Sequence, residues 1–322
     1  MNKKIFFVGN LKSSFIKNDY RGLQKYFNVR HTPMKLYFKL NILETIRNVI
    51  WANTIFCWFA SFRAVIPTIL GKILSKKVVV IAGGYDCVFT PEINYGAFTR
   101  IPDRWVSKFV FRHADIVLPV SKYIQKELLE KITPYETHTV YNGVDANKWY
   151  PQGVKDEKLV MTVGEINWNN LQRKGIEDFV KTAVYLPDVT FLVIGEFKDN
   201  AIDYLKAIAT RNVRFTGRVS DEELLIWYQR AKVYAQLSYH EGFGVSVAEA
   251  MLCECIPVLS TKGALPEVGG KNAYYVPFGD PEFTATVIER ALKSNNGGMF
   301  RARVALNFSM QKRINELRRI LE

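Results

Sequence analysis

Two glutamates separated by seven residues stand in a stretch whose residue types could bind a ligand. Glu241 follows the apolar run 233–237, and Gly242-Phe243-Gly244 separate it from an alanine-rich segment that carries Glu249. This order predicts a strand, a loop and then a helix that begins near residue 245. The loop amides and the positive end of the helix dipole converge where an anion can lie. Glu249 is expected to point back toward Glu241, so that both carboxylates face one cavity.

A carboxylate beside a nest of amides repels a bare phosphate, so the expected ligand also offers hydroxyl groups. A sugar nucleotide offers both kinds of group. The residue types alone leave a second interpretation open, in which Glu241 and Glu249 are solvated charges on a loop and on a helix surface.

The same stretch resembles glycosyltransferase family 4, a family of retaining GT-B enzymes. Its signature is Glu, seven residues and Glu, with Gly-Phe-Gly after the first, and residues 257–268 also fit the family's sequence. The resemblance implies that Glu241 contacts hydroxyls of the donor sugar and that Glu249 contacts the ribose hydroxyls. It also implies that the amides of residues 242–244 lie near the donor diphosphate.

The phosphate side of the expected site comes from an earlier segment. Lys174 matches the family lysine that holds the donor diphosphate, and a compact ammonium on a long stem suits that role. Glu165 stands where the family usually has arginine, so either Arg173 supplies the second positive charge or phosphate binding is weaker than in the family. Arg173 and Lys174 could also be ordinary solvated residues that precede a helix.

A third segment is expected to contact the nucleotide base. Residues 217–219 match the family's Gly-x-Val turn, beside which the base commonly packs. The resemblance therefore places Gly217 and Val219 among the donor-binding residues, without identifying the base.

The acceptor side departs from the family. Residues 82–86 resemble its His-Gly-x-Asp loop, but Gly83 stands where histidine is common. This leaves Asp86 as the catalytic candidate on the acceptor side, together with Glu241 and Lys174.

The elements that must position these loops alternate between strands and helices. Helices are expected at residues 19–26, 34–49, 62–74 and 104–113, and Ser121 is expected to cap a further helix. Strands are expected at residues 5–8, 54–59, 77–81, 114–121, 159–163, 190–194, 213–216, 233–237 and 256–259.

The alternation predicts an α/β fold with doubly wound parallel sheets. The resemblance implies the GT-B arrangement, in which two Rossmann-like domains face each other across a cleft. We expect an acceptor-binding domain at 1–150, a linker at 151–158 opening a nucleotide-sugar-binding domain at 151–298, and one final helix within 299–322 that crosses back to the first domain. No Gly-x-Gly-x-x-Gly motif appears, which argues against a nicotinamide enzyme.

Charge is distributed unevenly along the 322 residues. Residues 1–150 hold 22 Lys and Arg against 10 Asp and Glu, whereas residues 151–322 hold 22 against 21, and the formal net charge is +13. The basic half predicts an anionic partner, which could be a membrane surface, a phosphorylated lipid acceptor or nucleic acid. A charged surface that serves only solubility is the alternative. Lys35, Tyr37, Phe38 and Lys39 form the segment expected to contact a membrane.

Cysteine use and hydropathy indicate a cytoplasmic protein. The four cysteines show neither zinc-site spacing nor disulfide density, and no signal peptide opens the chain. No transmembrane segment is predicted, because the most apolar window, 49–70, contains Arg63 and Pro67. Peripheral contact with the inner face of the membrane is a further expectation.

The predicted function is that of a retaining, metal-independent glycosyltransferase with a UDP- or GDP-linked donor and a lipid-linked or glycan acceptor. No cofactor and no metal site are expected, because no Asp-x-Asp pair or His/Cys ligand cluster occurs. Lys174, Arg173 and the amides of 242–244 would stabilise the leaving diphosphate. The rivals are a phosphorylase or hydrolase on the same fold, and a basic nucleic-acid or anionic-surface binding protein with a degenerate GT-B fold. No nucleic-acid partner is predicted, because no recognisable binding motif is present.

Overall fold

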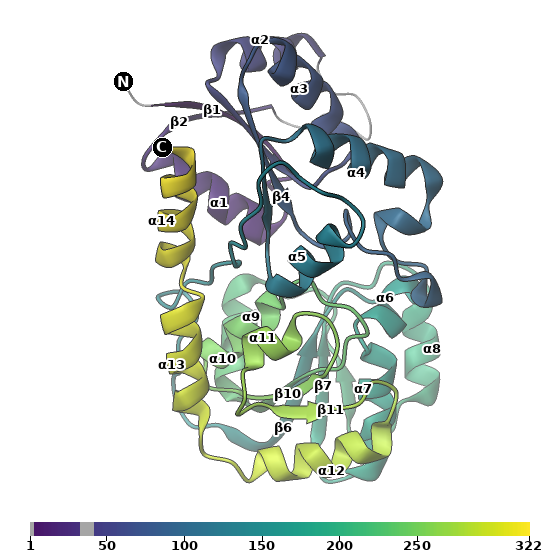
Figure 1. Cartoon of the computed structure of the whole chain (residues 1–322). Helices are drawn as coiled ribbons and strands as arrows, with labels where there is room; N and C mark the ends of the chain where they lie inside the picture. The colour runs from purple at the N-terminus through teal and green to yellow at the C-terminus, as the bar shows by residue number, and fades with distance from the viewer. Residues whose placement is uncertain (1–2, 33–41) are drawn as a thin grey trace. The chain divides into compact units, whose positions relative to one another are not determined.

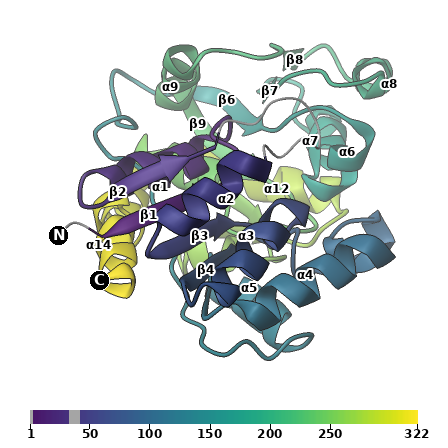
Figure 2. The same ribbon diagram turned by 90° about the horizontal axis from the view of Figure 1, so that it is seen from above.

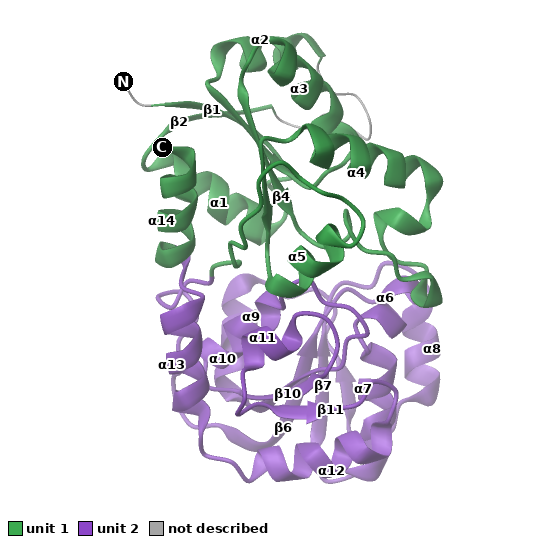
Figure 3. Ribbon diagram, in the orientation of Figure 1, with its two compact units in different colours: residues 1–143, 311–322 green, residues 144–310 purple. Residues whose placement is uncertain are grey.

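The computed structural model describes residues 3–32 and 42–322 (Figure 1). The chain forms two compact units (Figure 3). Unit 1 contains residues 1–143 and 311–322, and unit 2 contains residues 144–310. The assignment of an acceptor domain and a donor domain, with boundaries at 150 and 298, stays a prediction.

Unit 1 is built around a parallel five-stranded sheet in the order β2-β1-β3-β4-β5 (Figure 2). Its inner strands are buried along nearly their whole length, as expected for a parallel sheet covered on both faces. The strands are β1 (Lys4–Val8), β2 (Asn28–His31), β3 (Thr54–Trp58), β4 (Lys77–Ala82) and β5 (Ile116–Pro119). The helices are α1 (Ser14–Gln24), α2 (Ile42–Trp51), α3 (Phe62–Ile73), η1 (Pro91–Ile93), η2 (Ala97–Thr99), α4 (Ile101–His113), α5 (Lys122–Leu129) and α14 (Met310–Leu321).

Unit 2 is built around a parallel six-stranded sheet in the order β11-β10-β9-β6-β7-β8. The strands are β6 (Asp156–Val163), β7 (Thr190–Ile194), β8 (Val213–Phe215), β9 (Ala231–Gln236), β10 (Ile256–Ser260) and β11 (Tyr274–Val276). The helices are α6 (Trp168–Arg173), α7 (Ile176–Thr182), η3 (Ala183–Tyr185), α8 (Ala201–Ile208), α9 (Asp221–Arg230), α10 (Val245–Leu252), α11 (Leu265–Gly269), α12 (Pro281–Leu292) and α13 (Gly297–Asn307).

In both sheets the strand order reverses beside the first strand. The chain of unit 1 passes from β1 to β2 and then returns to β3 on the other side of β1. The chain of unit 2 passes from β6 through β7 and β8 and returns to β9 on the other side of β6. Ligands of open parallel sheets bind at the carboxyl ends of the strands where this reversal occurs. The loops after β6 and β9, and those after β1 and β3, are therefore the candidate positions for a site.

The prediction of two doubly wound parallel sheets is confirmed, and every predicted strand is present. The sequence analysis missed β2 and β11, which are short edge strands without a long apolar run; in β2 only Val29 is fully buried. The linker prediction for 151–158 is wrong in its second half, because β6 begins at Asp156, which pairs with Ala231. The helix predicted at 19–26 begins earlier, at Ser14.

Two further helix predictions need comment. Of the helix predicted at 34–49, residues 34–41 lie outside the described part of the chain, and α2 extends to Trp51. The single final helix is wrong, because α13 ends at Asn307 and α14 begins at Met310. Val144 N–H donates to Phe308 O (2.9 Å), and Met310 N–H donates to Val144 O (2.9 Å). Backbone pairing with Val144 therefore replaces the helical hydrogen bonds at this point.

A buried ion pair fastens α14 within unit 1. Arg313 Nε and Nη2 donate to the two carboxylate oxygens of Asp19 at 2.6 and 2.7 Å, and these side chains are 2% and 0% exposed. Arg313 Nη1 also donates to the carbonyl oxygens of Val140 (2.9 Å) and Tyr141 (2.8 Å). Trp58 Nε1 donates to Asp19 Oδ2 at 3.0 Å. The Arg313–Asp19 pair thus connects α14 to α1 and, through Trp58, to β3. Arg313 also connects α14 to residues 140 and 141, near the end of segment 1–143.

Asp19→Asn is expected to lower the free energy of unfolding by about 3–5 kcal/mol, because it leaves the buried Arg313 charge without its partner. Urea unfolding followed by circular dichroism measures the change. Arg319→Gln, at an exposed position of the same helix, is the control and should change stability by less than about 0.5 kcal/mol. A loss in Asp19→Asn as small as that of the control would contradict the importance of the pair.

Candidate active site

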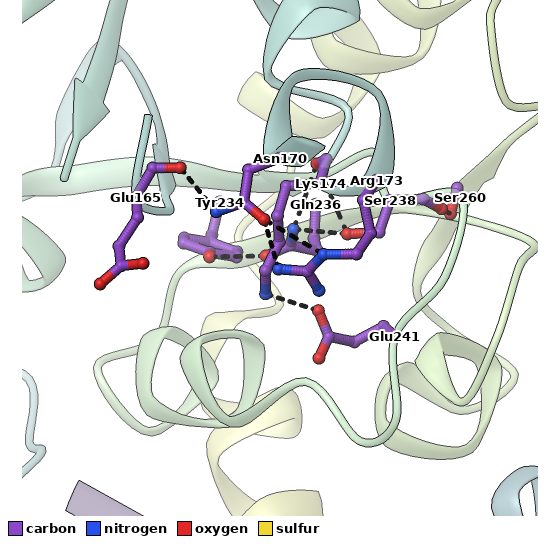
Figure 4. A network of polar contacts seen from close by, with 9 residues as sticks. All are labelled: Glu165, Asn170, Arg173, Lys174, Tyr234, Gln236, Ser238, Glu241 and Ser260. Carbon is purple, nitrogen blue, oxygen red and sulfur yellow. Dashed lines mark hydrogen bonds and ion pairs between the residues drawn. The ribbon is translucent and has the colours of Figure 1, made fainter. Parts of the chain in front are cut away.

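Lys174 and Glu241 form an ion pair at the strand-order reversal of unit 2 (Figure 4). Lys174 Nζ lies 2.7 Å from Glu241 Oε2, and the side chains are 17% and 14% exposed. Lys174 belongs to the segment after β6, and Glu241 belongs to the loop after β9, the strand that pairs with β6. The structure thus brings these two predicted site residues into direct contact, in a place that is shielded from water but still reachable.

A tight turn between α6 and α7 fixes the position of Lys174. Lys174 caps the C-terminus of α6, and Gly175 follows with φ +66°. A Cβ at Gly175 would lie 2.0 Å from the carbonyl oxygen of Leu237, so this close approach to the end of β9 requires glycine. Tyr239 N–H donates to the carbonyl oxygen of Arg173 at 3.0 Å. Backbone contacts between the two loops therefore carry Lys174 to Glu241.

A chain of buried polar side chains supports the loop after β9 (Figure 4). Tyr234 Oη donates to Gln236 Oε1 (2.9 Å), and Gln236 Nε2 donates to Ser238 Oγ (2.7 Å). Ser260 Oγ donates to the carbonyl oxygen of Ser238 at 2.5 Å. The sequence analysis missed this network. Its signal was available, because Gln236 interrupts the apolar run 233–237 and Ser238 follows it directly, and polar groups at buried positions need hydrogen-bond partners.

Neighbouring positive charges keep Glu241 ionised. Burial alone raises the pKa of this carboxyl group, but the charges of Lys174 and Arg173, the hydrogen bond from Lys174 and the charge of His240 outweigh it. The pKa of Glu241 therefore lies below its ordinary value. An ionised carboxylate only accepts hydrogen bonds, so Glu241 is suited to bind hydroxyl groups at neutral pH.

The environment of Glu249 raises its pKa, whereas that of Glu241 lowers its pKa. It belongs to α10, and its carboxyl group has hydrogen bonds with the Trp149 side chain and with Tyr228, whose Oη lies 3.5 Å from Oε2. Burial raises the pKa of Glu249 to about 8, although the charge of Lys148 opposes the shift. At neutral pH Glu249 is therefore mainly a neutral carboxylic acid. Trp149 and Tyr228 were not identified from the sequence, because their positions give no local signal.

The charges of Glu241 and Glu249 both affect the pKa of the buried Tyr234. Burial raises the pKa of Tyr234, and the charges of Glu241 and Glu249 raise it further. Both carboxyl groups therefore lie within electrostatic reach of the same side chain. The orientation of Glu249 toward Glu241 and the cavity that they would share stay predictions.

Residues 242–244 connect Glu241 to the first turn of α10. The helix begins at Val245, which confirms the predicted start, and Gly244 is its N-cap with φ +98°. Phe243 is 2% exposed, and its ring lies edge-on to Phe308 with centroids 5.3 Å apart. The Phe243 side chain thus serves packing, so only the backbone of this residue can contribute to an anion site at the positive end of the helix dipole.

Arg173 lies beside the ion pair, whereas Glu165 faces solvent. Arg173 Nε and Nη2 donate to Asn170 Oδ1 at 3.1 and 2.6 Å, which fixes the guanidinium near the end of α6. The Glu165 side chain is 59% exposed, and it lies 4.0 Å from Lys198 Nζ. Arg173 thus supplies a second positive charge near Glu241, and its role in binding the diphosphate stays a prediction.

Gly217 and Val219 lie in the loop after β8, at the same edge of the sheet but further along it. The carbonyl oxygen of Gly217 accepts a hydrogen bond from Gly195 N–H at 3.0 Å, which joins the loops after β7 and β8. Val219 is half-buried. The contact of these residues with a nucleotide base stays a prediction.

Asp86 belongs to unit 1, where it binds backbone amides. It is 2% exposed; Oδ2 accepts a hydrogen bond from Ala60 N–H and Oδ1 accepts one from Gly84 N–H, both at 3.0 Å. Burial raises the pKa of Asp86 to about 6, and the backbone donors oppose that shift. In this geometry the carboxylate joins the loops after β3 and β4. Its catalytic role stays a prediction.

Metal sites and membrane spans were sought throughout residues 3–32 and 42–322. Within these ranges, no group of three or more His, Cys, Asp and Glu side chains could hold a metal ion. No helix there has the length and apolar character needed to cross a bilayer. Metal independence of the reaction stays a prediction.

Sequence comparisons connect this site to known enzymes. Residues 157–294 match the family model described as "Glycosyl transferases group 1". An uncharacterized glycosyltransferase of Methanocaldococcus jannaschii is 24% identical over 347 residues, which cover 92% of this chain and 86% of that protein. The alpha-galactosylglucosyldiacylglycerol synthase of Streptococcus pneumoniae is 26% identical over 59% of this chain and 54% of its own length.

A solved structure gives the same fold. Anabaena Alr3699/HepE in complex with UDP and glucose superposes with a TM-score of 0.81 at 16% identity, over 100% of this chain and 99% of that one. The chain has the GT-B fold, as predicted. The comparisons together support a glycosyltransferase and do not favour a nucleic-acid or anionic-surface binding protein. Membership of family 4 in particular stays a prediction.

The pKa of Glu249 predicts a pH-dependent stability. Burial raises this pKa from 4.5 to about 8, so the folded protein binds the proton more tightly than the unfolded chain. The resulting stabilisation is fully present below pH 4.5 and is lost as the pH rises through about 8. Glu249→Gln, which does not titrate, is expected to remove this decline.

Urea unfolding of both proteins at several pH values between 5 and about 8.5 tests this expectation. Glu222→Gln, at an exposed position of α9, is the matched control and should follow the wild type. Parallel profiles for the wild type and Glu249→Gln would show that Glu249 titrates in its ordinary range.

Proposed function

We propose that the chain is a retaining, metal-independent glycosyltransferase that transfers a sugar from a UDP- or GDP-linked donor to a lipid-linked or glycan acceptor. The observation that carries the proposal is the Lys174–Glu241 pair at the strand-order reversal of unit 2. It places a cation suited to a diphosphate beside an ionised carboxylate suited to sugar hydroxyls. The UDP and glucose bound by the Anabaena protein support the donor class, and the diacylglycerol in the pneumococcal enzyme's name supports a lipid-linked acceptor.

The donor is bound by groups at one edge of the sheet of unit 2. A lysine ammonium has three N–H donors, so Lys174 can bind Glu241 and phosphate oxygens at the same time. Arg173 and the amides of residues 242–244 complete the diphosphate site. Glu241 accepts hydrogen bonds from the donor sugar, Glu249 binds the ribose hydroxyls, and the loop with Gly217 and Val219 contacts the base.

The reaction exchanges two bonds at the anomeric carbon of the donor. The bond to the diphosphate oxygen breaks, and the acceptor oxygen bonds on the same face, so the anomeric configuration is retained. The acceptor proton passes to the leaving diphosphate. Lys174 and Arg173 stabilise the charge that develops on the leaving group, and Glu241 holds the sugar in position.

A donor panel tests the function. A ligand that binds only the folded protein raises its melting temperature, so UDP-, GDP- and ADP-linked sugars are compared by thermal shift. We expect a shift with a UDP- or GDP-linked sugar, and we expect it to persist with EDTA. No shift with any sugar nucleotide would contradict a transferase, and turnover lost with EDTA and restored by a divalent ion would contradict metal independence.

Lys174→Met is expected to reduce kcat by about a hundredfold, more than it weakens donor binding, because the ammonium stabilises charge that develops in the transition state. Nucleoside diphosphate release measures kcat, and calorimetric titration measures donor binding. Lys181→Met is the control, since Lys181 pairs with Glu177 on α7. Normal turnover in Lys174→Met, with a loss in Arg173→Met, would assign the phosphate role to Arg173.

An anionic lipid surface is the proposed partner of unit 1. Residues 1–150 carry twelve of the thirteen net positive charges. Lys35, Tyr37, Phe38 and Lys39, from which membrane contact was predicted, lie outside the described residues.

Two described helices support the same proposal. α2 packs against α3 (Figure 1). Both helices carry exposed apolar side chains. Arg47 is exposed on α2, and Lys72 is exposed on α3. Basic and apolar groups on adjacent helices match the headgroups and the outer acyl region of an anionic bilayer. The exposed large apolar residues of the two helices are Ile42, Leu43, Ile50, Phe62, Ile69 and Ile73, followed by Leu74 at the C-cap of α3.

Co-sedimentation with vesicles of graded anionic phospholipid content tests this contact. We expect binding that rises with anionic content and is released by salt. Leu43→Glu combined with Ile73→Glu should weaken it, because a charge replaces an apolar contact at each position. Val154→Glu, at a residue of unit 2 that is 91% exposed, is the control. Equal binding by all three proteins would exclude α2 and α3 as the contact surface.

A further inference from the structure

Phe59 has a backbone conformation that is rare for a bulky residue. It follows β3 with φ +69°, in the left-handed region. Within residues 3–32 and 42–322, the other non-glycine residues with positive φ are Ser75, Asn94 and Glu254, so Phe59 is the aromatic one among them. A conformation of this kind persists only where the surroundings determine it, and such positions cluster at functional sites.

The surroundings of Phe59 do determine its backbone. Partners come from β4, from the loop after β4 and from α4, so three elements act on residues 59–61. The hydrogen bonds run from Phe59 N–H to Ile81 O (3.1 Å), from Ser61 N–H to Phe59 O (3.0 Å), from Ala60 N–H to Asp86 Oδ2 (3.0 Å) and from Ser107 Oγ to Ala60 O (2.9 Å).

Gly83, which follows β4, shows the opposite combination. Its backbone lies outside the left-handed region, so any residue could adopt its conformation. A Cβ at Gly83 would lie 2.1 Å from Cε1 of Phe59 and 2.9 Å from two further ring atoms. The Phe59 ring therefore fills the space that any side chain at position 83 would need, including the histidine that is common there in glycosyltransferase family 4.

The backbone conformations at positions 59 and 83 favour the opposite residue types from those present. Glycine would suit position 59, and a larger residue would suit position 83. What the observed arrangement adds is a flat aromatic face in the loop after β3.

This face lies where a ligand of unit 1 is expected. β3 adjoins β1 at the reversal of strand order, and Phe59 and Gly83 stand at the carboxyl edge of the sheet. Phe59 as a residue is half-buried, and its ring packs beside that of Trp58, with ring centroids 5.5 Å apart.

We propose that Phe59 is the platform of the acceptor site, on which the apolar face of an acceptor sugar packs. The inference rests on the proposed glycosyltransferase function and adds that the acceptor presents a sugar ring to unit 1. Aromatic rings bury a large apolar area with few rotatable bonds, which suits this role. Gly83 keeps the space for the ring, and Asp86 positions the Phe59 loop through Ala60.

The geometry is tested by a double-mutant cycle on thermal unfolding. Gly83→Ala is expected to lower the melting temperature, because its Cβ meets the ring. In a Phe59→Gly background the same change should have no effect, since the ring is absent and glycine relieves the left-handed backbone. An equal effect of Gly83→Ala in both backgrounds would overturn the assigned contact.

The role is tested by binding of octyl glycosides of glucose, galactose and mannose, measured by saturation-transfer NMR. Phe59→Leu, which keeps apolar bulk but loses the flat ring, should weaken binding by about 10- to 100-fold, and Phe59→Tyr should retain it. Trp105→Leu, at an exposed tryptophan of α4, is the matched control. Equal binding by Phe59→Leu and the wild type, or no binding of any glycoside by the wild type, would overturn the platform.

The donor thermal shift distinguishes a failure of the Phe59 platform from a failure of the proposed glycosyltransferase function. A normal shift in the wild type and in all Phe59 variants, with glycoside binding lost only in Phe59→Leu, supports the platform. A normal donor shift with unchanged glycoside binding in Phe59→Leu overturns the platform and leaves the transferase in place. Loss of the donor shift in the wild type would instead overturn the proposed function.

Discussion

A parallel sheet places the carboxyl ends of all its strands at one edge, and both units of this protein depend on that constraint. In unit 2 it brings together Lys174 and Glu241, which are 67 residues apart in the sequence. The pKa values of Glu241 and Glu249 shift in opposite directions, because the surroundings of the two carboxyl groups differ. Positive neighbours lower the pKa of Glu241, whereas burial raises that of Glu249. Opposite environments of this kind give two similar side chains different roles.

Close backbone approach is the means by which the loops reach these positions. Gly175 lets the turn after α6 lie against the end of β9, where a Cβ would meet a carbonyl oxygen. In unit 1 the space beside Gly83 is filled by the ring of Phe59, which accepts an unfavourable backbone conformation to lie there. In unit 2, the absence of a side chain at Gly175 therefore allows close backbone contact. In unit 1, the absence of a side chain at Gly83 leaves space for the ring of Phe59.

Much of the fold followed from the sequence, because buried parallel strands are long apolar runs and Gly-rich loops mark their ends. The sequence also indicated Glu241, because its glycine-containing loop follows an apolar strand and precedes a helix, whereas Lys174 was indicated by the resemblance to glycosyltransferase family 4. It missed β2 and β11, whose edge positions leave them half-exposed, and it missed the break at Phe308, which depends on pairing with Val144. Trp149, Tyr228 and Phe59 were missed for the same reason: tertiary contacts give them their roles, and no local pattern records such contacts.

The Arg313–Asp19 pair also sets an order of events during synthesis. Unit 2 is one continuous segment, so every residue it needs has been made once residue 310 is complete. Unit 1 begins first but contains a carboxylate whose partner arrives almost three hundred residues later, at a separation of 294. On the ribosome, the unit translated first is therefore expected to reach its final packing last. Until then, Asp19 and the other groups of unit 1 that bind Arg313 remain open to chaperones and proteases.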